Sequence, residues 1–187
     1  MHYELMTQKS HVSIKSVLFV CLGNICRSPI AEGIFRHIAE QRGFSHHFKI
    51  GSAGLGSWHI GHPPDQRAQD ALRGMGIDIS GLRARRVSPG DFDSYDLILA
   101  MDRSNRNALL RMAPAQHREK IKLFLTYAPN LSVQEVPDPF FGDTANFDYV
   151  CQLVDAACRG LFVNLTSQTP VQSTPAAIPG LSLSANG

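Results

Sequence analysis

The sequence predicts an α/β fold, in which a single doubly wound sheet of four parallel strands carries helices on both faces. Two observations lead to this prediction. Short apolar runs alternate along the chain with segments of helical periodicity, and these runs are apolar throughout, as in strands covered on both sides. The length of 187 residues suits one domain, and 43% hydrophobic residues suffice for a sizeable core.

The first strand and the first helix are clearly marked. Residues 16–22 form a continuous apolar run, which predicts a buried strand. A helix is expected to follow, because Ser28 is a preferred N-cap and Pro29 a preferred first helical residue. Gly43 is the expected C-cap. The apolar residues at helical spacing between these ends are Ile30, Ile34, Phe35 and Ile38.

Three further strands and three further helices follow in alternation. The strands are expected at residues 48–52, 95–101 and 120–125. The helices are expected at residues 64–75, 103–112 and 147–163, with a long loop before the last of them. Because strands that alternate with helices form parallel sheets, we predict a flavodoxin-like fold. In such a sheet, ligands bind beyond the C-terminal ends of the strands.

Both ends of the chain are predicted to lie outside the domain. Residues 1–14 are polar and aperiodic, which indicates an N-terminal arm. Residues 166–187 are rich in Ser, Thr, Pro, Ala and Gly and carry no charged side chain. Such a tail buries too little apolar surface to offset its ordering entropy, so we predict that it is disordered. The folded domain is therefore expected to span residues 15–165.

Composition argues against several classes of protein. The 18 basic and 16 acidic residues give a net charge of +2, which does not suit a polybasic nucleic-acid binder. The apolar run at residues 17–22 is far shorter than the roughly 20 residues that span a bilayer. Four cysteines are too few for a disulfide scaffold. We expect a cytoplasmic protein, a monomer or weak dimer, without nucleic-acid or membrane partners.

The turn from Cys21 to Arg27 joins a strand end to a helix N-terminus. Gly23 and Asn24 tolerate left-handed backbone angles, so this turn can point successive amide N–H groups inward. Together with the helix dipole, these groups form an anion-binding nest. Cys21 lies at its base, where the amides, the dipole, Arg27 and the Ser28 hydroxyl favour a thiolate. A thiolate beneath a bound phosphoryl group is a nucleophile aimed at phosphorus.

The Cys-x5-Arg spacing is by itself a weak signal, because it often arises by chance. Its context strengthens it, since a buried strand precedes the turn and a Ser-Pro helix start follows it. A nucleotide-binding P-loop needs a Gly-Lys pair, and the sequence contains none.

Asp138 is the candidate general acid for cleavage of a phosphate ester. It follows the fourth predicted strand and lies between Pro137 and Pro139, which restrict the backbone and would fix the carboxyl in space. The alternative interpretation is an ordinary Asp-Pro turn on the surface.

These residues resemble the signature elements of the low-molecular-weight protein tyrosine phosphatase family. The resemblance covers residues 16–163 and is carried by residues 21–29, 52–54, 64–67, 100–102 and 136–140, with Trp58 and Asn105. It implies that Cys21 attacks phosphorus, that Arg27 stabilises the transition state, and that Asp138 is first acid and then base. It also implies that no metal and no cofactor are needed. The implied phosphate-binding residues are Leu22, Gly23, Asn24, Ile25, Cys26 and Ser28.

Several other positions acquire roles from the resemblance. Ser52 is implied to support the loop, together with Asn24 and Ser28, and Trp58 is implied to form one wall of an aryl slot. Phe140 and Phe141 would form the opposite wall, where the family often has two tyrosines; the hydroxyls needed for regulation by phosphorylation are absent.

A further family position often holds a polar His, and this chain has Leu82 there, so one polar brace of the loop is missing. Asp102 is expected to cap a helix first and to border the site second.

The remaining cysteines and histidines have separate interpretations. The resemblance implies that Cys26 forms a reversible disulfide with Cys21; otherwise it is a small buried filler. Cys151 and Cys158 lie two turns apart on the last predicted helix and are expected in the core. The His46–His47 and His59–His62 pairs lack neighbouring Cys or carboxylate ligands, so we expect no metal site.

Three alternatives to a phosphatase acting on tyrosine-phosphorylated proteins remain. An arsenate reductase on the same scaffold needs extra cysteines in a mobile loop, whereas the second cysteine pair lies in a predicted helix. A protein-arginine phosphatase tends to carry Thr at the position of Ile25, and a bulkier apolar residue favours a flat aryl ester. A phosphopeptide-binding module without turnover would lack the nucleophile or the acid, and this chain has Cys21, Arg27 and Asp138.

Overall fold

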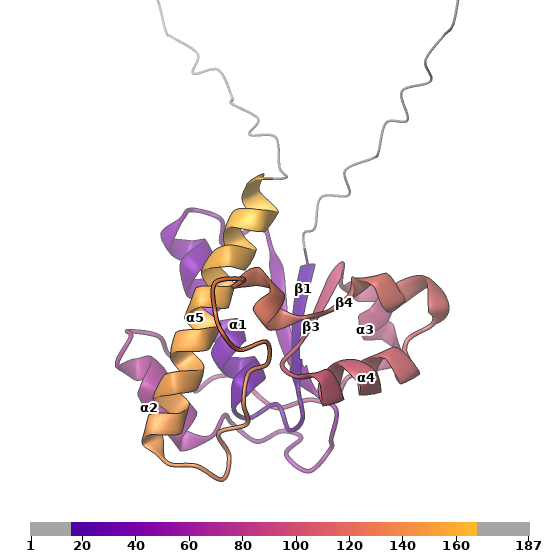
Figure 1. Ribbon diagram of the computed structural model, residues 1–187. Helices are drawn as coiled ribbons and strands as arrows, with labels where there is room; N and C mark the ends of the chain where they lie inside the picture. Colours follow the sequence, from indigo (N-terminus) through magenta and orange to yellow (C-terminus); the bar gives the residue numbers. More distant parts are fainter. Residues whose placement is uncertain (1–15, 168–187) are drawn as a thin grey trace, which may run out of the picture.

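A computed structural model describes residues 16–167 (Figure 1). Its centre is a sheet of four parallel strands in the order β2-β1-β3-β4. The strands are β1 (Ser16–Cys21), β2 (Lys49–Gly54), β3 (Leu97–Ala100) and β4 (Ile121–Leu123). The chain passes from β1 to β2 on one side and then returns to β3 on the other. The ends of β1 and β3 therefore mark the switch point at which such sheets bind ligands.

Five α-helices in the described range cover the sheet on both faces (Figure 1). They are α1 (Arg27–Gln41), α2 (Gln66–Arg73), α3 (Pro89–Ser94), α4 (Arg103–Met112) and α5 (Thr144–Ser167). Helices α1, α2 and α5 pack together on one face, and α3 and α4 lie on the other. This arrangement confirms the predicted doubly wound fold. None of the helices within residues 16–167 combines the length and the apolarity that crossing a bilayer requires.

Burial along β1 explains why this strand reads as a continuous apolar run. Val17 and Phe19 point into the larger core beneath α1 and α5, whereas Leu18 and Val20 point into the smaller core beneath α3 and α4. All four are completely buried. Successive side chains of a strand alternate between faces, so a strand covered on both sides has no position left for a polar residue.

The first helix differs from the prediction at its start and agrees with it at its end. It begins at Arg27 with Cys26 at the N-cap, and no side chain caps it, so the prediction of a Ser28 cap is wrong. The Ser28 hydroxyl bonds instead within the loop that precedes the helix. Gly43 follows the C-cap with φ at 76°, and the Phe44 N–H donates to the carbonyl of Ala39 at 2.7 Å. These features define a Schellman motif.

The remaining boundaries shift for local reasons. Helix α3 was not predicted, because six residues are too few for a visible helical period. Two local features mark its start. Pro89 is the first helical residue, and the Asp91 carboxylate accepts a hydrogen bond from the Ser88 N–H at 2.7 Å. The fourth strand ends at Leu123, because Phe124–Tyr127 forms a 3₁₀ helix, and another 3₁₀ helix, Ala115–Lys120, precedes it.

Helix α5 is longer than predicted and continues to Ser167. The predicted arm at 1–14 and the predicted tail at 166–187 lie outside the described residues, except for Thr166 and Ser167 at the end of this helix. The predicted domain limits therefore stay predictions.

Substitution of Gly160 by Ala is expected to destabilise the fold. A Cβ at this position of α5 would lie 1.8 Å from the backbone oxygen of Tyr127, so the helix would have to move away from the 3₁₀ helix beneath it. We expect Gly160→Ala to lower the free energy of unfolding by about 1–3 kcal/mol, although Ala favours a helix over Gly by about 1 kcal/mol. Urea denaturation measures the difference.

Gly90→Ala is the matched control, because the nearest atom to a Cβ there is 3.9 Å away. It should leave the unfolding free energy unchanged or raise it by about 0.4–1 kcal/mol. Equal stability of the two variants would contradict the tight packing at Gly160.

Candidate active site

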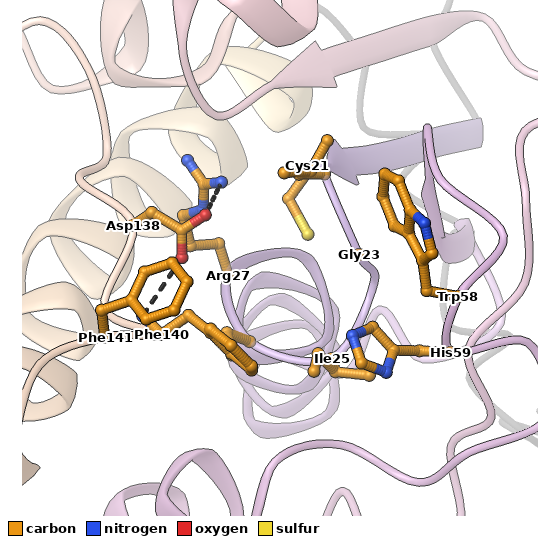
Figure 2. Close-up of a pocket in the computed structure, with 11 residues that line it drawn as sticks. Cys21, Gly23, Ile25, Arg27, Trp58, His59, Asp138, Phe140 and Phe141 are labelled. Carbon is orange, nitrogen blue, oxygen red and sulfur yellow. Dashed lines mark hydrogen bonds and ion pairs between the residues drawn. The ribbon is translucent and has the colours of Figure 1, made fainter.

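A pocket opens at the switch point of the sheet, directly beyond the end of β1. Figure 2 shows Cys21 at the strand end, Arg27 at the start of α1, and aromatic rings on both sides of the opening. The residues that line this pocket are Cys21, Leu22, Gly23, Ile25, Cys26, Arg27, Trp58, His59, Asp138, Phe140 and Phe141. Ten of these eleven were predicted as site residues from the sequence. The exception is His59.

The sulfur of Cys21 lies at the base of the pocket and is almost completely buried. The Asn24 N–H donates to it at 3.3 Å, and the Ser28 hydroxyl lies 3.1 Å away. Asn24 adopts a φ of 57°, the left-handed conformation that Asn tolerates, and this turns its N–H back toward the strand end. Gly23 serves another purpose, since a Cβ there would lie 3.1 Å from the His59 ring.

Three of the predicted residues lie behind the loop rather than in the pocket. The Asn24 amide nitrogen donates to the hydroxyl oxygens of Ser28 and Ser52, each at 2.9 Å. The Asn24 amide oxygen accepts from the Arg85 N–H at 2.9 Å. The structure thus brings Asn24, Ser28 and Ser52 together as a buried polar support. The Leu82 side chain packs against the larger core and contributes no hydrogen bond to this support.

Arg27 is 3% exposed and its guanidinium is held by three acceptors. It donates to the Asp102 carboxylate at 2.6 Å, to the Val136 carbonyl at 3.2 Å and to the Asp138 carboxylate at 2.5 Å. Asp102 also accepts from the Asn105 N–H at 2.6 Å, so it caps α4 as predicted and orients Arg27 as well. A buried guanidinium requires such counter-charges, because an unpaired buried charge is very costly.

Arg67 connects the segment that carries Asp138 to the rest of the site. Its guanidinium donates to the carbonyl oxygens of Gly142 at 2.8 Å and Phe140 at 3.0 Å, and it forms a two-point contact with Asp65. The hydrogen bonds from Arg67 to the Asp65 carboxylate hold the pKa of Asp65 below its usual value. The Asp65 N–H in turn donates to the Ile25 carbonyl at 2.8 Å. One cation therefore links the loop after β1 to the loop before α5.

The rim of the pocket is aromatic and largely exposed. Trp58 is 69% exposed and Phe141 98% exposed, and the Phe140 ring packs edge-on against Phe141 with centroids 5.0 Å apart. The centroids of the His59 and Phe140 rings lie 6.3 Å apart across the opening (Figure 2). Sequence reasoning considered His59 only as a metal ligand, although its place beside Trp58 could have marked it as a rim residue. No group of metal-ligand residues occurs within residues 16–167.

The four cysteines are all free thiols in the described structure. Burial raises the pKa of the Cys26 thiol well above its usual value, and the nearby charges of Asp65 and Cys21 add to this effect. Burial likewise raises the pKa of Cys151 to about 12 and holds that of Cys158 well above its usual value. The last two belong to the core beneath α5, as expected. Cys26 shares the pocket with Cys21.

The fold and the pocket together define an α/β enzyme in which a cysteine sulfur lies at the end of β1, beside the N-terminus of α1 and the buried Arg27 guanidinium. A family model described as low molecular weight phosphotyrosine protein phosphatase matches residues 16–171. The chain belongs to this family.

Known relatives agree with this assignment over most of the chain. The low molecular weight protein-tyrosine-phosphatase YfkJ of Bacillus subtilis (strain 168) is 46% identical over 153 residues, which is 82% of this chain and 97% of the relative. The Homo sapiens low molecular weight phosphotyrosine protein phosphatase is 40% identical over 147 residues, covering 78% and 92%. The crystal structure of YfkJ matches with a TM-score of 0.80 at 45% identity, covering 85% of this chain and 99% of that one.

Proposed function

We propose that this protein hydrolyses phosphotyrosine in proteins through a phosphocysteine intermediate on Cys21. The observation that carries the proposal is the arrangement of three groups in one pocket. The Cys21 sulfur lies at the base, the Arg27 guanidinium and the Asp138 carboxyl face it from one side, and aromatic rings border the opening (Figure 2). An aromatic rim above a base that holds a guanidinium suits a phosphate attached to a flat ring.

The first chemical step uses all three groups. The phosphate offers Arg27 two oxygens in place of the Asp138 carboxylate. The released carboxylate takes up a proton from solvent and turns toward the leaving oxygen. The Cys21 sulfur then attacks phosphorus as its thiolate, and the bond between phosphorus and the phenolic oxygen breaks. Asp138 gives its proton to that oxygen, so tyrosine leaves neutral. Backbone N–H groups of residues 22–27 and Arg27 stabilise the charge that develops on the phosphoryl oxygens.

The second step returns the enzyme to its starting state. Asp138, now a carboxylate, takes a proton from a water molecule that attacks phosphorus. The bond between phosphorus and sulfur breaks, inorganic phosphate forms, and the Cys21 thiolate is restored. Each proton that Asp138 gives is thus recovered within one cycle.

The alternatives have weaker support. Ile25 lines the pocket with an apolar side chain, which favours an aryl ester over the polar guanidinium of phosphoarginine. Cys151 and Cys158 are buried in α5 rather than held in a loop beside Cys21, so they do not suit the disulfide relay of an arsenate reductase. Tyrosine-phosphorylated proteins are therefore the proposed partners. The cytoplasmic location, the monomeric or weakly dimeric state and the lack of nucleic-acid and membrane partners stay predictions.

Turnover of phosphotyrosine and phosphoarginine peptides, measured side by side with a chelator present, tests the proposed function. We expect the phosphotyrosine peptide to be hydrolysed faster and the chelator to have no effect. Cys21→Ser should abolish turnover while inorganic phosphate still binds. Faster release of phosphate from the phosphoarginine peptide would support a protein-arginine phosphatase. Residual turnover by Cys21→Ser would exclude the phosphocysteine intermediate.

Replacement of Asp138 by Asn tests its role as the acid. We expect Asp138→Asn to slow the hydrolysis of esters with poor leaving groups by about 10²–10⁴-fold. The hydrolysis of esters with good leaving groups should slow much less, because only a poor leaving group needs the proton. Rates on a series of aryl phosphates of rising phenol pKa measure this. An equal loss across the series would contradict the assignment.

Oxidation by peroxide is expected to inactivate the protein reversibly through a Cys21–Cys26 disulfide. Peroxide converts the Cys21 thiolate to a sulfenic acid, and the Cys26 sulfur then displaces hydroxide from it to form the disulfide and water. Peptide-resolved mass spectrometry should find this bridge, and a reducing thiol should restore activity. Cys26→Ser should instead progress to sulfinic acid at Cys21. Sulfinic acid in the unmodified protein without a bridge would reject the redox role of Cys26.

A further inference from the structure

A buried carboxylate lies at the far end of the polar support behind Cys21. Glu32, on α1, is 5% exposed, and its Oε2 accepts a hydrogen bond from the Ser52 hydroxyl at 2.6 Å. Its Oε1 accepts from the Arg36 guanidinium at 2.7 Å and 3.1 Å. Arg36 lies one turn further along α1 and also donates to the Ile50 carbonyl. Neither residue lines the pocket.

The direction of each hydrogen bond in this chain follows from its two ends. A carboxylate has no hydrogen, so the Ser52 hydroxyl must donate to Glu32 and accept from the Asn24 amide nitrogen. The Arg85 N–H fixes the Asn24 amide in the same orientation, since it requires the amide oxygen. The Ser28 hydroxyl therefore accepts from Asn24, and its own hydrogen remains free.

The free hydrogen of Ser28 has two acceptors within reach. The Cys21 sulfur is 3.1 Å away and the Ala53 carbonyl 3.4 Å, and sulfur forms its hydrogen bonds at longer distances than oxygen does. The sulfur is therefore the better partner. The chain runs from Glu32 through Ser52, Asn24 and Ser28 and ends with a hydrogen directed at Cys21.

We propose that Glu32, held by Arg36, is a positioning residue that sets the direction of this chain and so keeps the Ser28 hydrogen on the Cys21 sulfur. The competing arrangement is a flip of the Asn24 amide. Its oxygen would then face both serines, both hydroxyls would donate to it, and the sulfur would lose its hydroxyl donor. Glu32 opposes the flip together with the Arg85 N–H, because Glu32 commits the Ser52 hydrogen to the opposite side. This inference deepens the proposed function of the same site and rests on it.

Glu32→Gln is the direct test, because it keeps the shape and removes the charge. Arg36 attracts the amide oxygen of the new side chain, which turns its NH₂ toward Ser52. This removes one of the two constraints on the Asn24 amide and leaves only the Arg85 N–H to oppose the flip. The measurement is the rate of Cys21 alkylation by iodoacetamide against pH, followed by peptide mass spectrometry without any substrate. We expect the pH of half-maximal rate to rise by about one unit, since a hydrogen bond to a charged group is lost. We expect kcat to fall about tenfold.

Two controls separate positioning from general damage. Glu40→Gln makes the same change at an exposed position of α1 and should not move the alkylation profile. In a Ser52→Ala background, Glu32→Gln should add no further shift, because the link to Asn24 is already cut. The other titratable groups in the pocket are the same in all of these variants, namely Cys26, Arg27, His59 and Asp138.

Rescue gives the sharpest discrimination. Adding Arg36→Met to Glu32→Gln frees the Gln oxygen to accept from Ser52, so the alkylation profile should move back toward that of the unmodified protein. If the ion pair between Glu32 and Arg36 were purely structural, the double variant should be less stable and its alkylation profile should not move back. Should Glu32→Gln fail to fold, Glu32→Met with Arg36→Met replaces the pair by apolar residues of similar size. This variant should still raise the pH of half-maximal alkylation.

The outcomes distinguish this inference from the proposed function. An unchanged alkylation profile in folded Glu32→Gln, or in the double Met variant, would overturn the role of Glu32. A shifted profile in a protein that hydrolyses no phosphotyrosine would support Glu32 and reject the proposed substrate.

Discussion

The buried guanidinium of Arg27 is the constraint on which the site depends. A cation that is 3% exposed has to be matched by acceptors, and these come from two other parts of the chain. Asp102 follows β3, and the Val136 carbonyl and Asp138 belong to the loop that precedes α5. Pairing one charge thus brings the ends of two strands and a distant loop around the cysteine.

The loop after β1 is held from two sides by different chemistry. Charged groups hold its pocket side, where Arg27 and the Arg67–Asp65 pair connect it to the loop that carries Asp138. Neutral hydrogen bonds hold its buried side, where Asn24 contacts two serines and the Arg85 N–H. The loop therefore stays supported without a polar side chain at Leu82, because the Arg85 N–H and the Glu32 carboxylate complete the network at its two ends.

The parts of the site that follow from local sequence were predictable, and those that depend on distant partners were not. Apolar runs mark β1, and the strand-turn-helix pattern places Cys21 and Arg27 at its end. Flanking prolines mark Asp138. Arg67 was not recognised as an anchor, since it bonds to carbonyls more than seventy residues away along the chain. For Ser28, the predicted contact with Cys21 is present and the predicted N-cap is absent, because its hydroxyl bonds within the loop.

The pairing of α1 with α5 has a consequence for how the protein is made. Helix α1 begins directly after the loop that follows β1, yet the helix that covers its apolar face ends at Ser167. On the ribosome, this loop emerges early but has no complete core behind it until that last segment has left the exit tunnel. A nascent or truncated chain therefore exposes the apolar face of α1 and needs protection from aggregation during this interval.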